Sequence, residues 1–230
     1  MPAWLLTLSV ISLLVAVAIA LWIAVDCRRH PQHMAIMGLV WPLCALFGSV
    51  PLLWFYLRHG RASGGHQHGD TPLPIAVAKG TLHCGSGCTL GDMLGEPLAF
   101  LLPAILVPLG WPDIFPEQMF AVWILDFILA FGIGIVFQYF AIAPMRNLRP
   151  LAGLKAAIKA DTLSLVSWQL GMYGTMAVAV FAIYRPLFGT EPDVSSPVFW
   201  FTMQFAMIAG FITACPMNWW LIRMGVKEKM

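Results

Sequence analysis

Long apolar stretches, separated by short polar ones, run from one end of the chain to the other. An apolar stretch of about 20 residues is long enough to cross a lipid bilayer as a helix. Pro42 and Pro51 interrupt the second stretch, so we expect that helix to be kinked or broken. The pattern predicts six transmembrane helices, at residues 4–25, 34–57, 88–109, 117–143, 154–184 and 198–222.

One polar insert, residues 58–71, separates the second apolar stretch from the third and is rich in glycine and histidine. Such a composition is typical of a flexible loop. We therefore predict three parts: an N-terminal two-span hairpin (1–60), a polar His/Gly loop and linker (61–80), and a four-span core domain (81–230).

Composition supports a polytopic, all-α membrane protein. Hydrophobic residues make up 60% of the chain and charged residues only 10%, against about 25% charged in an ordinary soluble domain. A net charge of +2 without a basic patch gives no sign of a nucleic-acid partner. The five cysteines are an odd number, which does not resemble a secreted disulfide framework. No Lys or Arg precedes the first span, so a removed signal peptide is not expected.

The charges of the loops predict an orientation. With six spans, 10 of the 13 Lys and Arg residues fall on the side of the C-terminus and 3 on the other. The positive-inside rule then places both termini in the cytoplasm, and we expect a multi-pass protein of a bacterial inner membrane. Arg28 and Arg29 are discordant, because this topology places them outside.

Chemically active side chains recur every four residues from just before the third span into it. Cys84, Cys88, Asp92 and Glu96 form one stripe if this segment is helical. Two thiols beside the imidazole of His83 suit a soft metal ion, and carboxyl groups at membrane depth indicate function. The alternative is a glycine-rich helix start whose cysteines are only small and buried.

A second four-residue repeat lies in the fourth span, where Asp126, Ala130, Gly134 and Gln138 share a face. Small residues permit close helix packing in membranes, so this face should meet other helices. Asp126 lies near mid-bilayer and favours function, with helix-to-helix hydrogen bonding as the alternative. For Asp161, at the start of the fifth span, the alternative is that it balances the two lysines before it.

Soft ligands form a further collection. Two methionine pairs are spaced four residues apart, one pair in each of the last two spans, and the polar insert holds a His-x-His motif. Thioethers and thiolates suit Cu(I), although methionine is also an ordinary filler of hydrophobic cores. The candidate ligands of Cu(I) or another soft metal ion are His83, Cys84, Cys88, His66, His68, Met172, Met176, Met203 and Met207.

Several other chemistries lack their sequence signatures. The spans contain no pair of histidines to act as axial haem ligands. The sequence has no nucleotide-binding glycine loop with lysine and no motif of a serine hydrolase or zinc protease. We therefore expect a protein that is not an enzyme.

Five short stretches carry a resemblance to a known family. They are 83–92 (His-Cys-Gly-Ser-Gly-Cys-Thr-Leu-Gly-Asp), 137–145, 156–165, 171–174 and 216–222. Together they resemble a bacterial integral-membrane family known as domain of unknown function 4396. The resemblance covers about residues 81–228, which implies that the last four spans are the working unit. It implies a membrane protein and no established reaction.

Three functions remain open from the sequence. The favoured one is binding or translocation of a soft metal ion, Cu(I) first. The second is a proton- or cation-coupled transporter of a small solute that uses the buried carboxyl groups. The third is a non-catalytic assembly subunit of a membrane complex. Membrane lipid is the expected partner, with a homo-oligomer or a larger complex left open.

Overall fold

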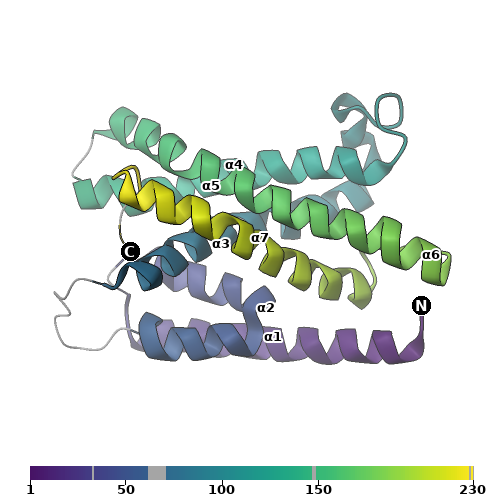
Figure 1. Ribbon diagram of the computed structural model, residues 1–230, viewed down its shortest axis with the longest axis horizontal. Helices are drawn as coiled ribbons and strands as arrows, with labels where there is room; N and C mark the ends of the chain where they lie inside the picture. Colours follow the sequence, from purple (N-terminus) through teal and green to yellow (C-terminus); the bar gives the residue numbers. More distant parts are fainter. Residues whose placement is uncertain (33, 62–70, 147–148, 228, 230) are drawn as a thin grey trace.

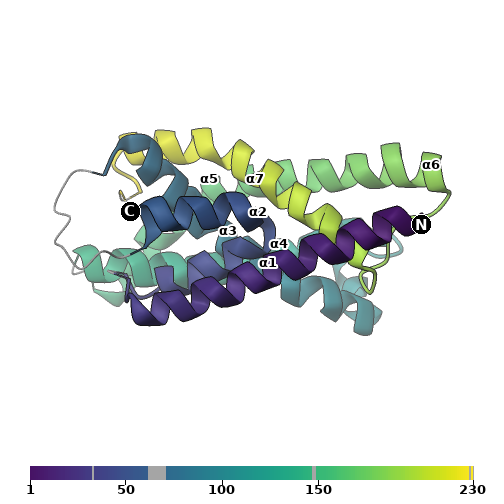
Figure 2. The same cartoon turned by 90° about the horizontal axis from the view of Figure 1, so that it is seen from below.

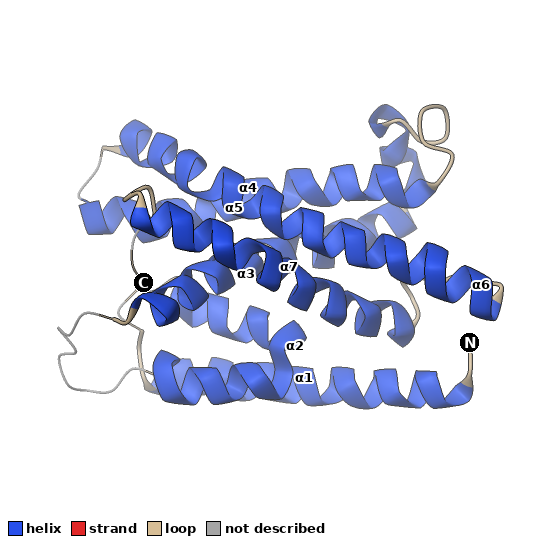
Figure 3. Ribbon diagram, viewed as in Figure 1, coloured by secondary structure: helices blue, strands red, loops and turns tan. Residues whose placement is uncertain are grey.

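The computed structural model describes residues 1–32, 34–61, 71–146, 149–227 and 229. The described chain is helical, with no strand in these ranges (Figure 3). Its elements are α1 (Ala3–Arg29), α2 (Met37–Phe55), η1 (Tyr56–Gly60), α3 (Leu73–Leu101), η2 (Pro103–Leu109), α4 (Gln118–Arg146), α5 (Pro150–Ala177), η3 (Val178–Tyr184), α6 (Arg185–Phe188) and α7 (Pro197–Arg223).

Length and composition confirm a polytopic, all-α membrane protein. Five helical segments are long and apolar enough to cross a membrane, and they include α1, α2 with η1, α4, α5 with its continuation, and α7. The pair α3 and η2 makes a sixth candidate if it counts as one span, although it bends by 106° at the break between the two.

Helix α2 is bent back on itself. Ser49 has φ 43 and ψ −129, a backbone conformation that residues other than glycine rarely adopt. Pro51 follows two residues later. The two halves then lie side by side, because the rings of Trp41 and Tyr56 are 5.4 Å apart between centroids. The segment therefore enters the helical bundle and returns to the end from which it started (Figures 1 and 2).

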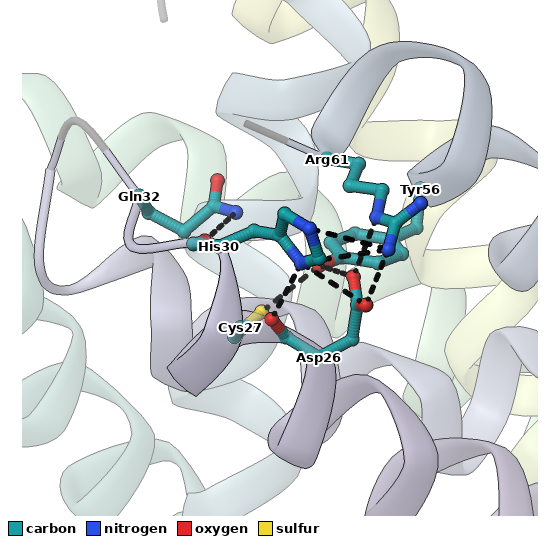
Figure 4. A network of polar contacts seen from close by, with 6 residues as sticks. All are labelled: Asp26, Cys27, His30, Gln32, Tyr56 and Arg61. Atoms are coloured by element: carbon teal, nitrogen blue, oxygen red, sulfur yellow. Dashed lines mark hydrogen bonds and ion pairs between the residues drawn. The ribbon is translucent and has the colours of Figure 1, made fainter. Parts of the chain in front are cut away.

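A polar network fixes this return. The Tyr56 hydroxyl donates a 2.8 Å hydrogen bond to Asp26 Oδ2, at the end of α1. Arg61 donates to both oxygens of the same carboxyl group, from Nε at 3.0 Å and from Nη2 at 2.9 Å. Cys27 donates in turn to the Tyr56 hydroxyl (Figure 4). The end of η1 thus lies beside the end of α1.

The remaining long helices run the length of the bundle, and the two termini lie at opposite ends of it (Figure 1). We call the end that holds the N-terminus the acidic end; its charged residues are Asp113, Glu117, Arg185, Glu191 and Asp193. The opposite end, with the C-terminus, is the basic end. The termini therefore lie at opposite ends of the bundle, whereas the sequence predicted both on one side of the membrane; the physical reason for this arrangement is the break at Ser49.

The first prediction concerns this topology. A compartment-sensitive reporter fused before Met1 and the same reporter fused after Met230 should report opposite sides of the membrane, because α2 with η1 returns instead of crossing. A reporter inserted after Gly189 should match the N-terminal fusion. Identical signals from the two terminal fusions would contradict the re-entrant hairpin.

Close contact between α3 and α4 holds the centre of the bundle together. A Cβ atom added at Gly87 would lie 3.0 Å from the Gly134 Cα, and one added at Gly91 would lie 2.7 Å from the Ala130 nitrogen. At Gly95 an added Cβ would collide with the Asp126 carboxyl group. The glycine stripe of α3 therefore packs against the face of α4 that the sequence predicted to meet another helix.

The second prediction tests this contact. Gly91→Ala should lower the free energy of unfolding by about 1–3 kcal/mol, the usual penalty for inserting a methyl group into a packed interface. Thermal unfolding of the purified protein in detergent measures the effect. The matched control is Gly132→Ala on α4, where an added Cβ meets nothing within 4 Å. Equal unfolding temperatures for the two variants would show that this interface is loose.

Candidate functional site

The chemically active stripe of α3 is buried. His83, Cys84, Cys88, Asp92 and Glu96 each have at most 5% of their surface exposed. The helix runs without interruption through these positions, so that one face carries the thiols and then the carboxyl groups. Glycines on the neighbouring face allow other helices to approach, which removes these side chains from lipid and solvent alike.

Three carboxyl groups gather where α3 packs against α4. Asp92 and Glu96 come from α3, and Asp126 comes from the facing position on α4; the three are close enough to interact electrostatically. Tyr173 of α5 lies beside the same three groups. Its ring stacks on Trp123 at 4.7 Å, and its hydroxyl donates to the Trp123 carbonyl oxygen at 2.8 Å. We call Asp92, Glu96 and Asp126 the carboxyl cluster.

The carboxyl cluster lacks a counter-ion in the described part of the chain. No ion pair there joins a Lys or Arg to any of its members. Both oxygens of Asp92 and both oxygens of Asp126 are buried and have no hydrogen-bond partner among the described residues. Buried polar groups are normally hydrogen-bonded, so this arrangement is costly for the fold and indicates a functional role.

A cavity connects the carboxyl cluster with the acidic end. It has a volume of about 240 Å³ and reaches Glu96 at its inner side. Glu117, Glu191 and Asp193 line its outer part, and Met176 lines its wall. Acidic side chains therefore line the cavity both at its outer part and at its inner side.

Arg185 forms ion pairs with two of the acidic residues at the mouth of this cavity. It donates to both oxygens of Glu117, at 2.9 and 2.6 Å, and its Nη2 lies 2.8 Å from Glu191 Oε2. The hydrogen bond from Arg185 is the main reason that the pKa of Glu117 lies below its usual value. Glu117 thus stays ionised at the entrance.

A second polar cluster lies towards the basic end. Asp161 and Ser164 of α5 face Asn218 of α7, and Lys227, just beyond α7, reaches into the same space. The Cys84 thiol lies near both Asp161 and Cys88. We call Asp161, Ser164, Asn218 and Lys227 the lysine cluster.

The predicted soft-metal ligands are only partly brought together. Cys84 and Cys88 are neighbours and free thiols, while the His83 ring packs against Phe137 at 6.3 Å between centroids. No group of three His, Cys, Asp or Glu residues that could hold a metal ion occurs in the described ranges. The motif of His66 and His68 lies outside those ranges.

The methionine pairs are buried as well. Met172 packs in the main core, and Met176 lines the cavity that leads to Glu96. Met203 and Met207 line a different cavity, of about 320 Å³, together with Asp92 and Gln204. The amide of Gln138 is buried in α4 and has no hydrogen-bond partner among the described residues.

Sequence reasoning missed Lys227, Tyr173 and the acidic mouth of the cavity. Lys227 follows the last apolar stretch and reads as part of a charged tail, so nothing in the pattern indicated burial. Tyr173 lies in the 171–174 stretch that resembles the family, but nothing in that stretch indicated that it would lie beside the buried acids. The acids of the mouth are far apart in sequence and meet only through the fold.

Fold and site together define a polytopic helical membrane protein with carboxyl groups buried along its axis. The chain belongs to the family described as Domain of unknown function (DUF4396), whose model matches residues 75–227. That match confirms the resemblance and spans α3 to Lys227, leaving out α1 and α2. No curated protein and no solved structure matches the chain.

Proposed function

We propose that this protein is a proton-coupled transporter of a small solute, in which the carboxyl cluster carries the coupling protons. The observation behind this proposal is the cluster itself: three acids from two helices lie together, buried, with no cation paired to them in the described chain. Two carboxylates that share a site repel each other unless a proton or cation lies between them. Membrane depth adds to that cost.

A proton fits this cluster better than a coordinated metal ion does. A metal needs several ligands at fixed short distances, and the described residues form no such group. A proton needs only one carboxyl oxygen at a time. Transfer between Glu96, Asp126 and Asp92 is then a relay along the axis, with Tyr173 as a neighbouring hydroxyl group.

Charge distribution supports a direction for entry. The 13 Lys and Arg residues of the chain all lie in described segments, and Arg185 is the one at the acidic end, which leaves 12 towards the basic end. By the positive-inside rule the basic end faces the cytoplasm and the N-terminus lies outside. Arg28 and Arg29 then agree with the rule. Protons would enter through the acidic mouth and meet Glu96 first.

The Cu(I) hypothesis from the sequence stays a prediction. Fewer of its candidate ligands lie together in the described part of the structure than the sequence suggested. Its best remaining feature is the cavity of Met203 and Met207, which also contacts Asp92. We propose a transport role and no catalysed reaction, in a bacterial inner membrane. A role as an assembly subunit gives no reason for carboxyl groups without partners along the axis.

The third prediction separates carboxyl from sulfur chemistry. Proteoliposomes with a trapped pH-sensitive dye receive an outward K⁺, Na⁺ or Cu(I) gradient, and proton movement is followed. Asp126→Asn and Glu96→Gln should each lower the proton flux by at least about tenfold, because an amide keeps hydrogen bonds and cannot carry the proton. Met203→Leu with Met207→Leu, and Cys84→Ser with Cys88→Ser, should leave most of the flux.

The matched control for the acids is Asp113→Asn, since Asp113 is an exposed acid at the acidic end. It should behave as wild type. Wild-type flux in Asp126→Asn and Glu96→Gln would overturn the proposal. Loss of flux only in the sulfur variants, with copper bound to the purified protein, would favour the Cu(I) hypothesis instead.

A further inference from the structure

Lys227 is a buried lysine at the end of the chain. After α7 the backbone turns at Gly225, which has φ 67, and folds back on the helix. The backbone nitrogens of Val226 and Lys227 both donate to the Leu221 carbonyl oxygen, at 3.0 and 3.2 Å. The side chain of Lys227 then enters the bundle and has no exposed surface. Lysine is almost never fully buried unless it is paired.

Oxygen atoms from two helices receive the ammonium group. Lys227 Nζ donates to Asn218 Oδ1 at 2.7 Å and lies 3.9 Å from Asp161 Oδ1. Asn218 is held in place because its Nδ2 donates to Ser164 Oγ at 2.7 Å. The third wall is α3, where Gly80 leaves room for the lysine: an added Cβ there would lie 3.8 Å from Lys227 Cε.

The fit between lysine and carboxyl group is loose. A salt bridge at 3.9 Å is longer than a charged hydrogen bond, which is about 2.7–2.9 Å. The two Asp161 oxygens have no hydrogen-bond partner among the described residues. Asp161 is thus a buried carboxyl group without a short contact to the ammonium group; the Cys84 thiol and the backbone of Gly134 lie beside it, and an amide oxygen and a hydroxyl group lie nearby. Such an oxygen set suits a small monovalent cation.

We propose that Asp161, Asn218 and Ser164 form a second cation site, at the basic end, and that Lys227 is a tethered cation that occupies it in this structure. An exchangeable monovalent cation of the alkylammonium class takes the place of the Lys227 ammonium when the tail swings out. The occupied state closes the basic end of the bundle. This inference deepens the proposed function, because it supplies the closure that coupled transport needs at that end.

Cys84 provides a native reporter of this closure. It is 1% exposed and lies near Asp161, so under this proposal we expect a reagent from the basic end to reach it only when Lys227 has left. A methanethiosulfonate reagent forms a mixed disulfide with the thiolate and releases a sulfinate. Peptide mass spectrometry of the full chain locates the label at Cys84, with partly exposed Cys215 as an internal reference.

The fourth prediction is a labelling experiment on purified protein. Lys227→Met should raise the rate of Cys84 labelling by a cationic methanethiosulfonate about tenfold, since loss of one charged hydrogen bond shifts an opening equilibrium by that order. Methylammonium, the free form of the missing side-chain group, should slow this labelling in Lys227→Met. It should have no such effect in the double variant Asp161→Asn with Lys227→Met.

Lys229→Met is the matched control, because Lys229 is an exposed residue of the same tail; it should label like wild type. Unchanged Cys84 labelling in a folded Lys227→Met protein would overturn the inference, and so would equal acceleration in Lys229→Met. If Lys227→Met fails to fold, Lys227→Arg, with the charge kept, and the double variant, with both charges removed, replace it. The double variant should then label faster than Lys227→Arg, and equal rates would overturn the closure.

Indifference to methylammonium in Lys227→Met, which is open and keeps Asp161, would overturn the cation site. Labelling needs no transport, so this result and the proteoliposome result succeed or fail separately.

Discussion

The close approach of α3 to α4 is the contact on which the rest of the structure depends. Gly87, Gly91 and Gly95 remove the side chains that would hold the two helices apart. Only at this short separation can the polar face of α3 be covered by neighbouring helices, which keep it away from lipid. The carboxyl cluster follows directly, since Gly95 and Asp126 occupy the same level of the interface. Carboxyl groups on a helix with larger neighbours would face hydrocarbon, where their cost is several kcal/mol.

The two ends of the bundle use opposite solutions for their charges. At the acidic end Arg185 is partly exposed and is shared by Glu117 and Glu191, so water screens the pair and its contribution to stability is small. At the basic end Lys227 is buried beside Asp161 without a short contact. A buried charge is strongly destabilising when its partner is removed. The second arrangement is therefore the one that can act as a switch.

Much of this fold could be predicted from the sequence, because an apolar stretch of about 20 residues is long enough to cross a bilayer as a helix. The four-residue steps of α3 and α4 also predicted which faces pack, since helical spacing alone puts Asp126, Ala130 and Gly134 on one side. The return of α2 could not be derived in the same way. Pro42 and Pro51 predict an irregular helix. The direction of the chain after the break depends on the backbone of Ser49 and on the hydrogen bonds that Tyr56 and Arg61 donate to Asp26. Those contacts join residues about 30 positions apart.

The site residues that could be predicted are those marked by a repeat within one helix, and those that could not are brought into the site by contacts between distant parts of the chain. Periodicity along α3 identified Asp92 and Glu96, a separate repeat along α4 identified Asp126, and the fold adds that the three meet. The burial of Lys227 could not be predicted from the sequence. It depends on the space left by Gly80 and on the oxygen atoms of Asn218 and Asp161, which only the fold brings together. In the topology that we propose, α2 returns and the number of crossings is odd, so Arg28 and Arg29 lie on the same side as the other basic residues. A single backbone break thus removes the one discordance in the distribution of the 13 positive residues, and it does so by reversing the chain, with no change in any charge.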